Sequence, residues 1–228
     1  MTNKFWLGTS ALLFVFILIY GLYTKSQTLI PSSTKVFQKK TVVIDAGHGL
    51  PDNGAVSEDG IYENEINLEI ARELEKQLKK AGMTVIMTRK DSNSLSTSKT
   101  NNKREDLNRR VGIRDSSNAD LFVSIHLNHF SDAKYSGAQV FYGSGNEESE
   151  LAAGILQNNL IKIVDPSNKR TPMKSDNIYI IKNTKIPSVL VECGFLSNPT
   201  EAKLLSTSEY QKKISSALYC GICEYLAK

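Results

Sequence analysis

The body of the chain alternates short runs of β-branched residues with longer segments of helical period. From residue 40 onward, each apolar run of a few residues is followed by a segment in which apolar side chains recur every three or four positions. This alternation is typical of βαβ units, in which helices connect parallel strands and cover the sheet. We therefore predict an α/β fold: a single domain with a largely parallel, open, twisted sheet of about six strands and helices on both faces.

The expected elements follow from the same periods. Strands are predicted at 41–45, 84–88, 121–125, 137–142, 178–181 and 188–191. Helices are predicted at 65–80, 104–117, 151–164, 199–205 and 209–226. The polar segment 92–103 has no period and is expected to be a surface loop.

The N-terminal segment has a different character from the body. Residues 5–23 are 19 consecutive positions without a charged side chain. A helix of that length rises about 1.5 Å per residue and can cross a hydrocarbon core of about 30 Å. We predict an uncleaved membrane helix in 1–25, a polar linker in 26–39 and one folded domain in 40–228, held outside the cytoplasm. A cleaved signal peptide is the alternative, but the apolar run does not end in the small residues of a cleavage site.

Charge and cysteine content exclude other classes of protein. The chain has 28 basic and 24 acidic residues, which is too balanced for a protein that binds nucleic acid through a concentrated basic face. The cysteines are three in number, an odd count that cannot form a disulfide framework: Cys193, Cys220 and Cys223. No second pair is present to complete a four-cysteine zinc site. We expect these thiols to be small, buried, apolar side chains.

All three histidines fall at the ends of predicted strands. His48 follows the first strand, and His126 and His129 follow the strand at 121–125. Because ligands gather beyond the carboxyl ends of strands in open α/β sheets, His48 and His126 are expected to converge on a metal ion. His129 is expected to be a loop residue. The alternatives are that it donates a hydrogen bond to a metal ligand or is itself an alternative ligand. Asn128 either caps a turn or binds substrate.

Two carboxylates could complete a hydrolytic site. A catalytic zinc ion commonly has two histidines, one glutamate and a water as ligands. Glu63 precedes the first predicted helix and is the best candidate for the third ligand, whereas Glu65 and Glu69 are expected to be solvated. Glu192 ends an apolar strand, where an ionisable group is costly unless it is paired or functional. Beside a metal-bound water, Glu192 would act as a general base.

These motifs resemble those of the zinc-dependent N-acetylmuramoyl-L-alanine amidases of the type 3 family. The resemblance covers residues 40–228 and rests on four ordered motifs: 45–49 (DAGHG), 63–68 (ENEINL), 119–128 (ADLFVSIHLN) and 191–198 (VECGFLSN). It implies one Zn²⁺ ion held by His48, Glu63 and His126, with Glu192 as the catalytic carboxylate. The reaction it implies is cleavage of the amide between the lactyl group of N-acetylmuramic acid and the L-alanine of the stem peptide in peptidoglycan.

Within this family, segments 135–142 (YSGAQVFY) and 165–168 (DPSN) are similar to those of membrane-anchored, germination-specific amidases of spore-forming bacteria. That similarity implies formation of muramic lactam in the spore cortex, a location in the cell wall or the forespore intermembrane space, and a lipoprotein helper. His129 and the long polar loop 92–103 depart from the family pattern. The alternative functions are a zinc peptidase that acts on cell-wall peptides and a non-catalytic glycan-binding scaffold.

Overall fold

The computed structural model describes residues 37–98 and 102–228. Residues 37–228 form one compact unit, close to the predicted domain boundary at residue 40. The predicted membrane helix in 1–25 and most of the predicted linker lie outside the described residues. Within the described ranges, no helix is long and apolar enough to cross a membrane.

A six-stranded sheet in the order β2-β1-β3-β6-β4-β5 forms the centre of this unit. The strands are β1 (Thr41–Ala46), β2 (Thr84–Met87), β3 (Leu121–Asn128), β4 (Gln139–Tyr142), β5 (Met173–Lys174) and β6 (Ser188–Phe195). β4 runs antiparallel to β6, and every other neighbouring pair is parallel. The predicted α/β fold with a largely parallel sheet is confirmed.

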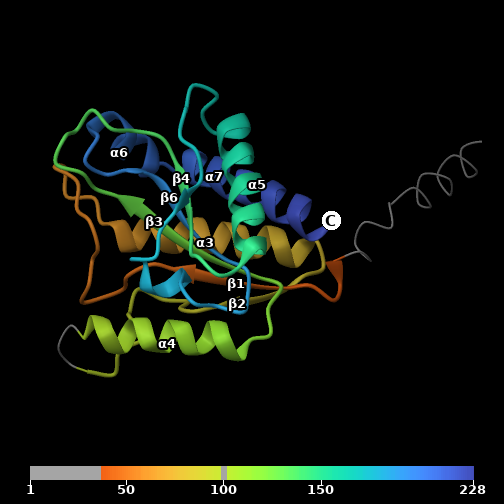
Figure 1. The fold of residues 1–228 in the computed structure, drawn as a ribbon. Coiled ribbons are helices and arrows are strands. Elements are labelled where there is room, and N and C mark those ends of the chain that lie inside the picture. The colour runs from red at the N-terminus through yellow and green to blue at the C-terminus, as the bar shows by residue number, and fades with distance from the viewer. Residues whose placement is uncertain (1–36, 99–101) are drawn as a thin grey trace, which may run out of the picture. The chain divides into compact units, whose positions relative to one another are not determined.

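Helices cover both faces of the sheet (Figure 1). One face carries α3 (Glu63–Lys80), α5 (Glu147–Ile163), α6 (Pro199–Leu205) and α7 (Ser208–Leu226), and the other carries α4 (Lys103–Ser116) and the 3-10 helix η1 (Tyr179–Ile181). Successive strand side chains point to opposite faces, so Ile44 packs in the larger core under α3 while Val43 packs in the smaller core under α4. Burial on both faces explains why the strands read as continuous apolar runs.

The predicted strand at 178–181 is wrong, because this segment forms η1. The Ile181 amide donates to the Ile178 carbonyl, and Ile180 and Ile181 pack into the smaller core. The Arg114 guanidinium of α4 donates to the Ile180 carbonyl, which holds the turn against the sheet. A short apolar run does not reveal its backbone conformation, because a buried turn and a buried strand share the same composition.

Helix α4 buries a charged face. Its buried side chains are Asp106, Arg110 and Arg114, whereas Leu107 and Val111 are only half-buried. The sequence places Leu107, Val111 and Arg114 together on one side of the helix, and only Arg114 is fully enclosed. The inner face of α4 therefore carries polar connections to the sheet in place of an apolar stripe.

The cysteines are free thiols that differ in exposure. Cys193 is buried in β6, Cys223 is half-buried and Cys220 is exposed on α7. The expectation of three buried apolar thiols is therefore wrong for Cys220, because α7 turns that position toward solvent.

Candidate active site

His48 lies in the turn that leaves the carboxyl end of β1. Its backbone has a φ of 60°, a left-handed conformation that is uncommon for a residue with a side chain and that often occurs at functional sites. The Arg110 guanidinium of α4 donates to the His48 carbonyl and helps to hold this conformation. The Asp52 carboxylate lies 3.0 Å from His48 Nδ1 and fixes the direction of the ring.

Glu63 is the first residue of α3, where helix amides have no partner within the helix. The Glu63 amide donates to the Ala55 carbonyl, so the preceding loop holds the start of the helix against the site. The Glu63 carboxylate is buried and accepts hydrogen bonds from Ala55 N at 2.8 Å, Leu127 N at 3.0 Å and Asn67 Nδ2 at 3.1 Å. These donors fix both carboxylate oxygens in place.

His126 lies within β3, because this strand continues to Asn128 and does not end at the predicted residue 125. Its ring meets the ring of His48 edge-on, with 4.9 Å between the ring centroids. Gly47 lets the backbone pass beside the His126 ring: a Cβ at position 47 would lie 2.3 Å from His126 Cε1. The close approach of the two histidines thus requires a glycine between β1 and His48.

His48, Glu63 and His126 converge. Each offers one ligand atom, and these atoms all lie within 4.8 Å of one another. Nε2 of His48 is 3.3 Å from Glu63 Oε2, and Nδ1 of His126 is 3.0 Å from Glu63 Oε1. Two imidazoles and one carboxylate are a donor set that suits a catalytic zinc ion. The three residues could therefore hold a metal ion.

The surroundings of Glu63 and His48 favour the charged forms of these two side chains. Burial alone would raise the pKa of Glu63, but the hydrogen bonds and charges of His126 and His48 hold it below its ordinary value. Burial would lower the pKa of His48, but Glu63 and Asp52 raise it to about 9. With Nδ1 directed at Asp52, the nitrogen that faces Glu63 is Nε2, and a metal ion bound there would displace a proton.

Glu192 lies within β6 and pairs with His126 of β3 in the parallel register. Its Oε2 atom is enclosed and accepts no hydrogen bond within the part of the chain that the structure describes. Burial, with the charge of Glu63 adding to it, raises the pKa of Glu192 to about 7, although the imidazoles of His126 and His48 oppose the shift. A carboxyl group with a pKa near neutrality can both take up and release a proton.

The remaining predicted residues lie at the margin of this group. Asn128 is half-buried at the end of β3, and its carbonyl accepts from the Leu196 amide. Its role in substrate binding stays a prediction. His129 is exposed in the loop after β3, as expected, and is not one of the three converging residues. Glu65 and Glu69 are exposed on α3, also as expected.

Sequence reasoning missed three residues that support the site. Asp52 orients His48, and it lies in a loop without any period that could have drawn attention to it. Arg89 donates to the Ala46, Gly47 and Asn64 carbonyls, and Arg110 donates to Asp45, Asp106 and two backbone carbonyls of the same turn. The spacing of Asp106, Arg110 and Arg114 at every fourth position is the one signal that could have revealed a charged inner face on α4.

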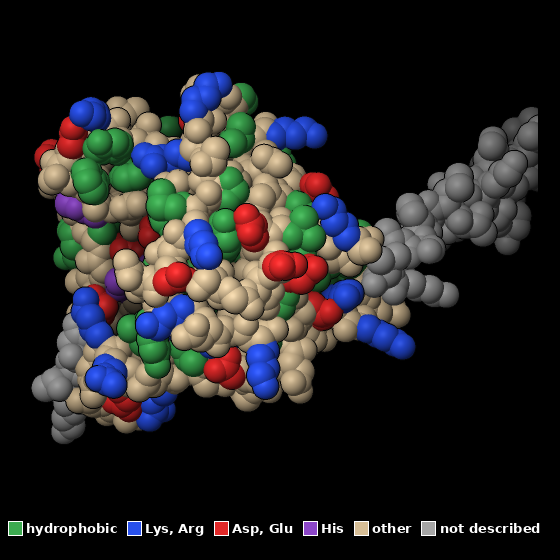
Figure 2. Space-filling model, viewed as in Figure 1, with side chains coloured by type: hydrophobic (Ala, Val, Ile, Leu, Met, Phe, Trp, Pro, Cys, Tyr) green, Lys and Arg blue, Asp and Glu red, His purple; other side chains and the backbone are tan. Residues whose placement is uncertain are grey.

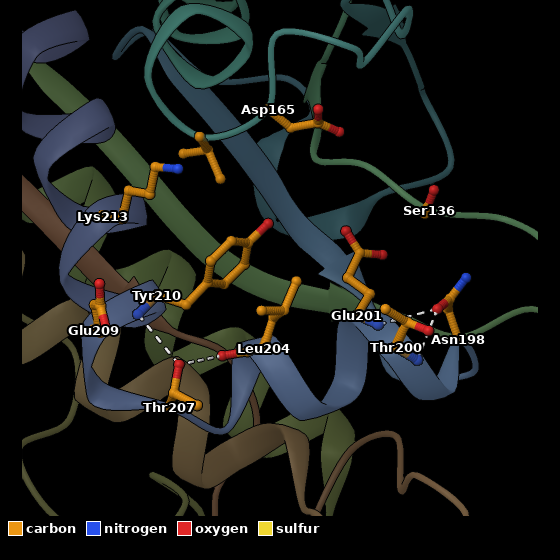
Figure 3. A pocket seen from close by; sticks show the side chains of 11 residues that line it. Ser136, Asp165, Asn198, Thr200, Glu201, Leu204, Thr207, Glu209, Tyr210 and Lys213 are labelled. Carbon is orange, nitrogen blue, oxygen red and sulfur yellow. Dashed lines mark hydrogen bonds between the residues drawn. The ribbon is translucent and has the colours of Figure 1, made fainter.

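The surface around the site is shown in Figure 2, where histidine side chains lie along one margin of the molecule with acidic side chains recessed near them. A separate hollow of about 700 Å³ lies beside α6 and the start of α7 (Figure 3). It is lined by residues such as Asn198, Glu201 and Tyr210 and by none of the predicted site residues. The chemistry is therefore assigned to the converging histidines and carboxylates, not to this larger hollow.

The fold and the site together define a class of protein. Two histidines and a glutamate lie at the carboxyl edge of a largely parallel sheet, with a second carboxyl group of raised pKa beside them. This arrangement suits a hydrolase with an α/β fold that would activate water at a bound metal ion.

Comparison with known proteins identifies the family to which the chain belongs. The family model described as N-acetylmuramoyl-L-alanine amidase matches residues 42–224. The germination-specific N-acetylmuramoyl-L-alanine amidase of Bacillus subtilis is 38% identical over 193 residues, which cover 83% of this chain and 81% of that protein. The chain belongs to the N-acetylmuramoyl-L-alanine amidase family, and it is a hydrolase of peptidoglycan amides.

Solved structures agree with this assignment. The CwlD amidase from Clostridioides difficile, determined in complex with the GerS lipoprotein, is 44% identical with a TM-score of 0.80, and the match covers 82% of this chain and 98% of that one. The catalytic domain of CwlV, an N-acetylmuramoyl-L-alanine amidase from Bacillus (Paenibacillus) polymyxa var. colistinus, is 32% identical with a TM-score of 0.70 and coverage of 82% and 98%. The predicted family resemblance is confirmed.

Proposed function

We propose that the chain cleaves the amide between the lactyl group of N-acetylmuramic acid and the L-alanine of the stem peptide, and that it does so in the spore cortex. The convergence of His48, Glu63 and His126 beside Glu192 is the observation that carries the catalytic part of the proposal. The similarity to a germination-specific amidase supports the cortex role, in which glycan freed of peptide can go on to form muramic lactam.

We assign one Zn²⁺ ion to His48, Glu63 and His126. The donor set fits this ion, and Asp52 leaves Nε2 of His48 directed at the same point as the other ligand atoms. When bound, the ion would polarise the lactyl carbonyl and make the attacking water more acidic.

Glu192 supplies the proton transfers in this proposal. Its carboxylate takes one proton from the attacking water as the new C–O bond forms at the lactyl carbonyl carbon. As the C–N bond breaks, Glu192 returns that proton to the departing nitrogen of L-alanine. The second proton of the water stays on the new hydroxyl group, so the products are a lactyl carboxyl group on the glycan, which then ionises to solvent, and a stem peptide with a free amine. The enclosed Oε2 atom and the raised pKa of Glu192 support this role.

The location and the partner form a second part of the proposal. We place the domain outside the cytoplasm, in the cell wall or the forespore intermembrane space, with residues 1–25 as its membrane anchor. The charge-free run at 5–23 supports the anchor. A lipoprotein helper is proposed because the similar CwlD amidase was solved in complex with a lipoprotein.

The test uses the full-length chain purified in detergent, with and without added zinc. Mass analysis of digested peptidoglycan should show free stem peptides that begin with L-alanine and glycan strands with free lactyl groups. Cleavage within the stem peptide would identify a peptidase instead. Binding of peptidoglycan without any cleavage, by a chain that contains stoichiometric zinc, would identify a non-catalytic scaffold.

A further inference from the structure

An exposed aromatic cluster lies at the ends of the strands that carry His126 and Glu192. Phe130 packs edge-on against Tyr135 with 5.0 Å between ring centroids, and Tyr135 stacks on Phe195 at 6.4 Å. Phe195 is buried, but Phe130 is 52% exposed and Tyr135 is 38% exposed. Two large aromatic side chains in contact with each other and with solvent form an apolar patch of the kind that marks binding surfaces.

The cluster borders the proposed reaction site. Phe195 pairs with Asn128 across β6 and β3, and Asn128 is two residues beyond His126 in the same strand. A strand rises about 3.3 Å per residue, which places the cluster about 7 Å further along the strands than the His126 and Glu192 pair. Figure 2 shows hydrophobic side chains beside the histidines on this margin of the molecule.

The loop that carries Phe130 and Tyr135 is held by the segment that follows β6. The Phe130 amide donates to Ser197 Oγ at 3.1 Å, and Asn198 Nδ2 donates to the Ala133 carbonyl at 2.9 Å. The loop is thus anchored at two points, and the exposed rings are preorganised before any ligand arrives.

Glu201 adds a buried anchor at the base of the cluster. Its carboxylate accepts from the Gly137 amide at 2.9 Å and from the Phe195 amide at 2.7 Å, so one side chain joins the end of the loop to the end of β6. Figure 3 shows Glu201 rising from α6 toward the chain segment that contains Ser136. The two exposed rings therefore rest on a fixed base.

Basic groups flank the aromatic rings. The Arg170 guanidinium lies 4.6 Å from the centroid of Phe195, and Lys134 Nζ lies 5.4 Å from the centroid of Tyr135. Lys134 also pairs with Asp132. A surface that offers aromatic faces beside cations suits a polymer of sugar rings that carries carboxylates, because sugar rings have an apolar face and the carboxylates are attracted to the cations.

We propose that Phe130 and Tyr135 form a stacking platform for sugar rings of the peptidoglycan glycan strand that lie next to the cleaved muramic acid. The inference rests on the proposed function and adds a glycan subsite to it. The occupant is the glycan because the platform continues from the reaction site along the same two strands. The stem peptide and a protein partner are the other occupants that the experiment tests.

The first test measures binding by sedimentation with insoluble glycan strands from which the stem peptides have been removed. The full-length chain should sediment with these strands, and the F130A/Y135A variant should bind about tenfold more weakly. Y135F retains the ring and should bind like the unmodified chain. The matched control is L151A, which removes a 39% exposed side chain from α5. Leu151 lies away from the aromatic cluster, because Ser149 of the same helix turn accepts a hydrogen bond from the Ser188 amide, at the opposite end of β6 from Phe195.

The second test measures turnover. For polymeric peptidoglycan, F130A/Y135A should raise KM about tenfold with little change in kcat, and for a muramyl peptide with one sugar it should change neither. The platform would be overturned if F130A/Y135A lost kcat/KM equally on both substrates or bound glycan like the unmodified chain. It would also be overturned if free stem peptide competed with glycan for binding to the unmodified chain. A variant that binds glycan normally but no longer binds a lipoprotein helper would also overturn it. Absence of hydrolysis by the unmodified chain would refute the proposed function alone, because the sedimentation test does not depend on turnover.

Discussion

Glu192 of β6 stands opposite His126 of β3 in the parallel register of the sheet. Paired residues of neighbouring strands point to the same face, about 5 Å apart, so the register brings the proposed general base beside a proposed metal ligand. The same pairing places Phe195 opposite Asn128, at the start of the aromatic platform. One strand pair thus carries a proposed metal ligand, the proposed base and the start of the proposed platform.

Replacement of Glu192 by Gln should separate metal binding from catalysis. The amide keeps the shape of the side chain but cannot accept a proton from water, so kcat should fall by about 10² to 10⁴-fold. Metal content, measured by elemental analysis, should not change because Glu192 is not among the three converging residues. Activity close to that of the unmodified chain would show that another group is the base.

Replacement of Asp52 by Ala should weaken metal binding without unfolding the domain. Asp52 fixes the ring of His48 from 3.0 Å, and loss of such a partner lowers metal affinity by about 10 to 100-fold. Competition with a chelator measures the affinity, and thermal unfolding of the metal-free chain reports on the fold. D59A removes an exposed carboxylate from the same connection and should leave the affinity unchanged.

Replacement of Gly47 by Ala should displace the His126 ring. The added methyl group would lie 2.3 Å from His126 Cε1, closer than atoms can approach, so the ring must move away from the position in which it would bind a metal ion. We expect at least about a tenfold loss of metal affinity in the chelator competition, by analogy with other losses of ligand orientation.

The control for Gly47 is G112A, on the exposed face of α4, where an added methyl group meets nothing within 4 Å. G112A should preserve metal binding and stabilise the helix by up to about 1 kcal/mol. Equal metal affinity in G47A and G112A would mean that the approach of the backbone to His126 has no role in the metal site.

The free energy of unfolding should decrease in acid, because protonation of Asp45 removes a buried charge partner of Arg110. This side chain is fully buried and binds Arg110 Nη1 at 2.7 Å and Ser124 Oγ at 2.6 Å. Burial would raise its pKa, but Arg110 and the hydroxyl donors hold it below the ordinary value of 3.8. Its contribution to stability is therefore complete above the ordinary pKa and decreases as the pH falls below that value toward the folded-state pKa.

The D45N variant tests this contribution. At pH 7 it should lower the free energy of unfolding by about 3 kcal/mol, because it leaves Arg110 without part of its charge partner in a buried position. The free energy of unfolding, measured with denaturant at pH 7 and near pH 3, should decrease less between these two pH values in D45N than in the unmodified chain. An acid dependence identical in both chains would remove Asp45 as its source.

Much of the fold and part of the site could be predicted from the sequence. Strands buried on both faces read as apolar runs, and helices that pack on one side read as periodic stripes, so the order of elements follows from local patterns. His48, Glu63, His126 and Glu192 could be selected because each is a polar residue at the end of an apolar strand or the start of a helix. The prediction of a strand at 178–181 was wrong, because a short apolar run specifies burial but not backbone conformation.

What the sequence alone determined is therefore the class of fold and the identity of the groups that gather at one edge of the sheet. The tertiary structure decided which of them meet, through the register of β3 with β6 and through the turn that brings Asp52 to His48. It also decided that Arg110 bonds the turn at His48 and that Phe130 lies beside Tyr135. These contacts join loops and helices that have no common period, and their distances depend on how the whole chain packs, so no local pattern of residues encodes them.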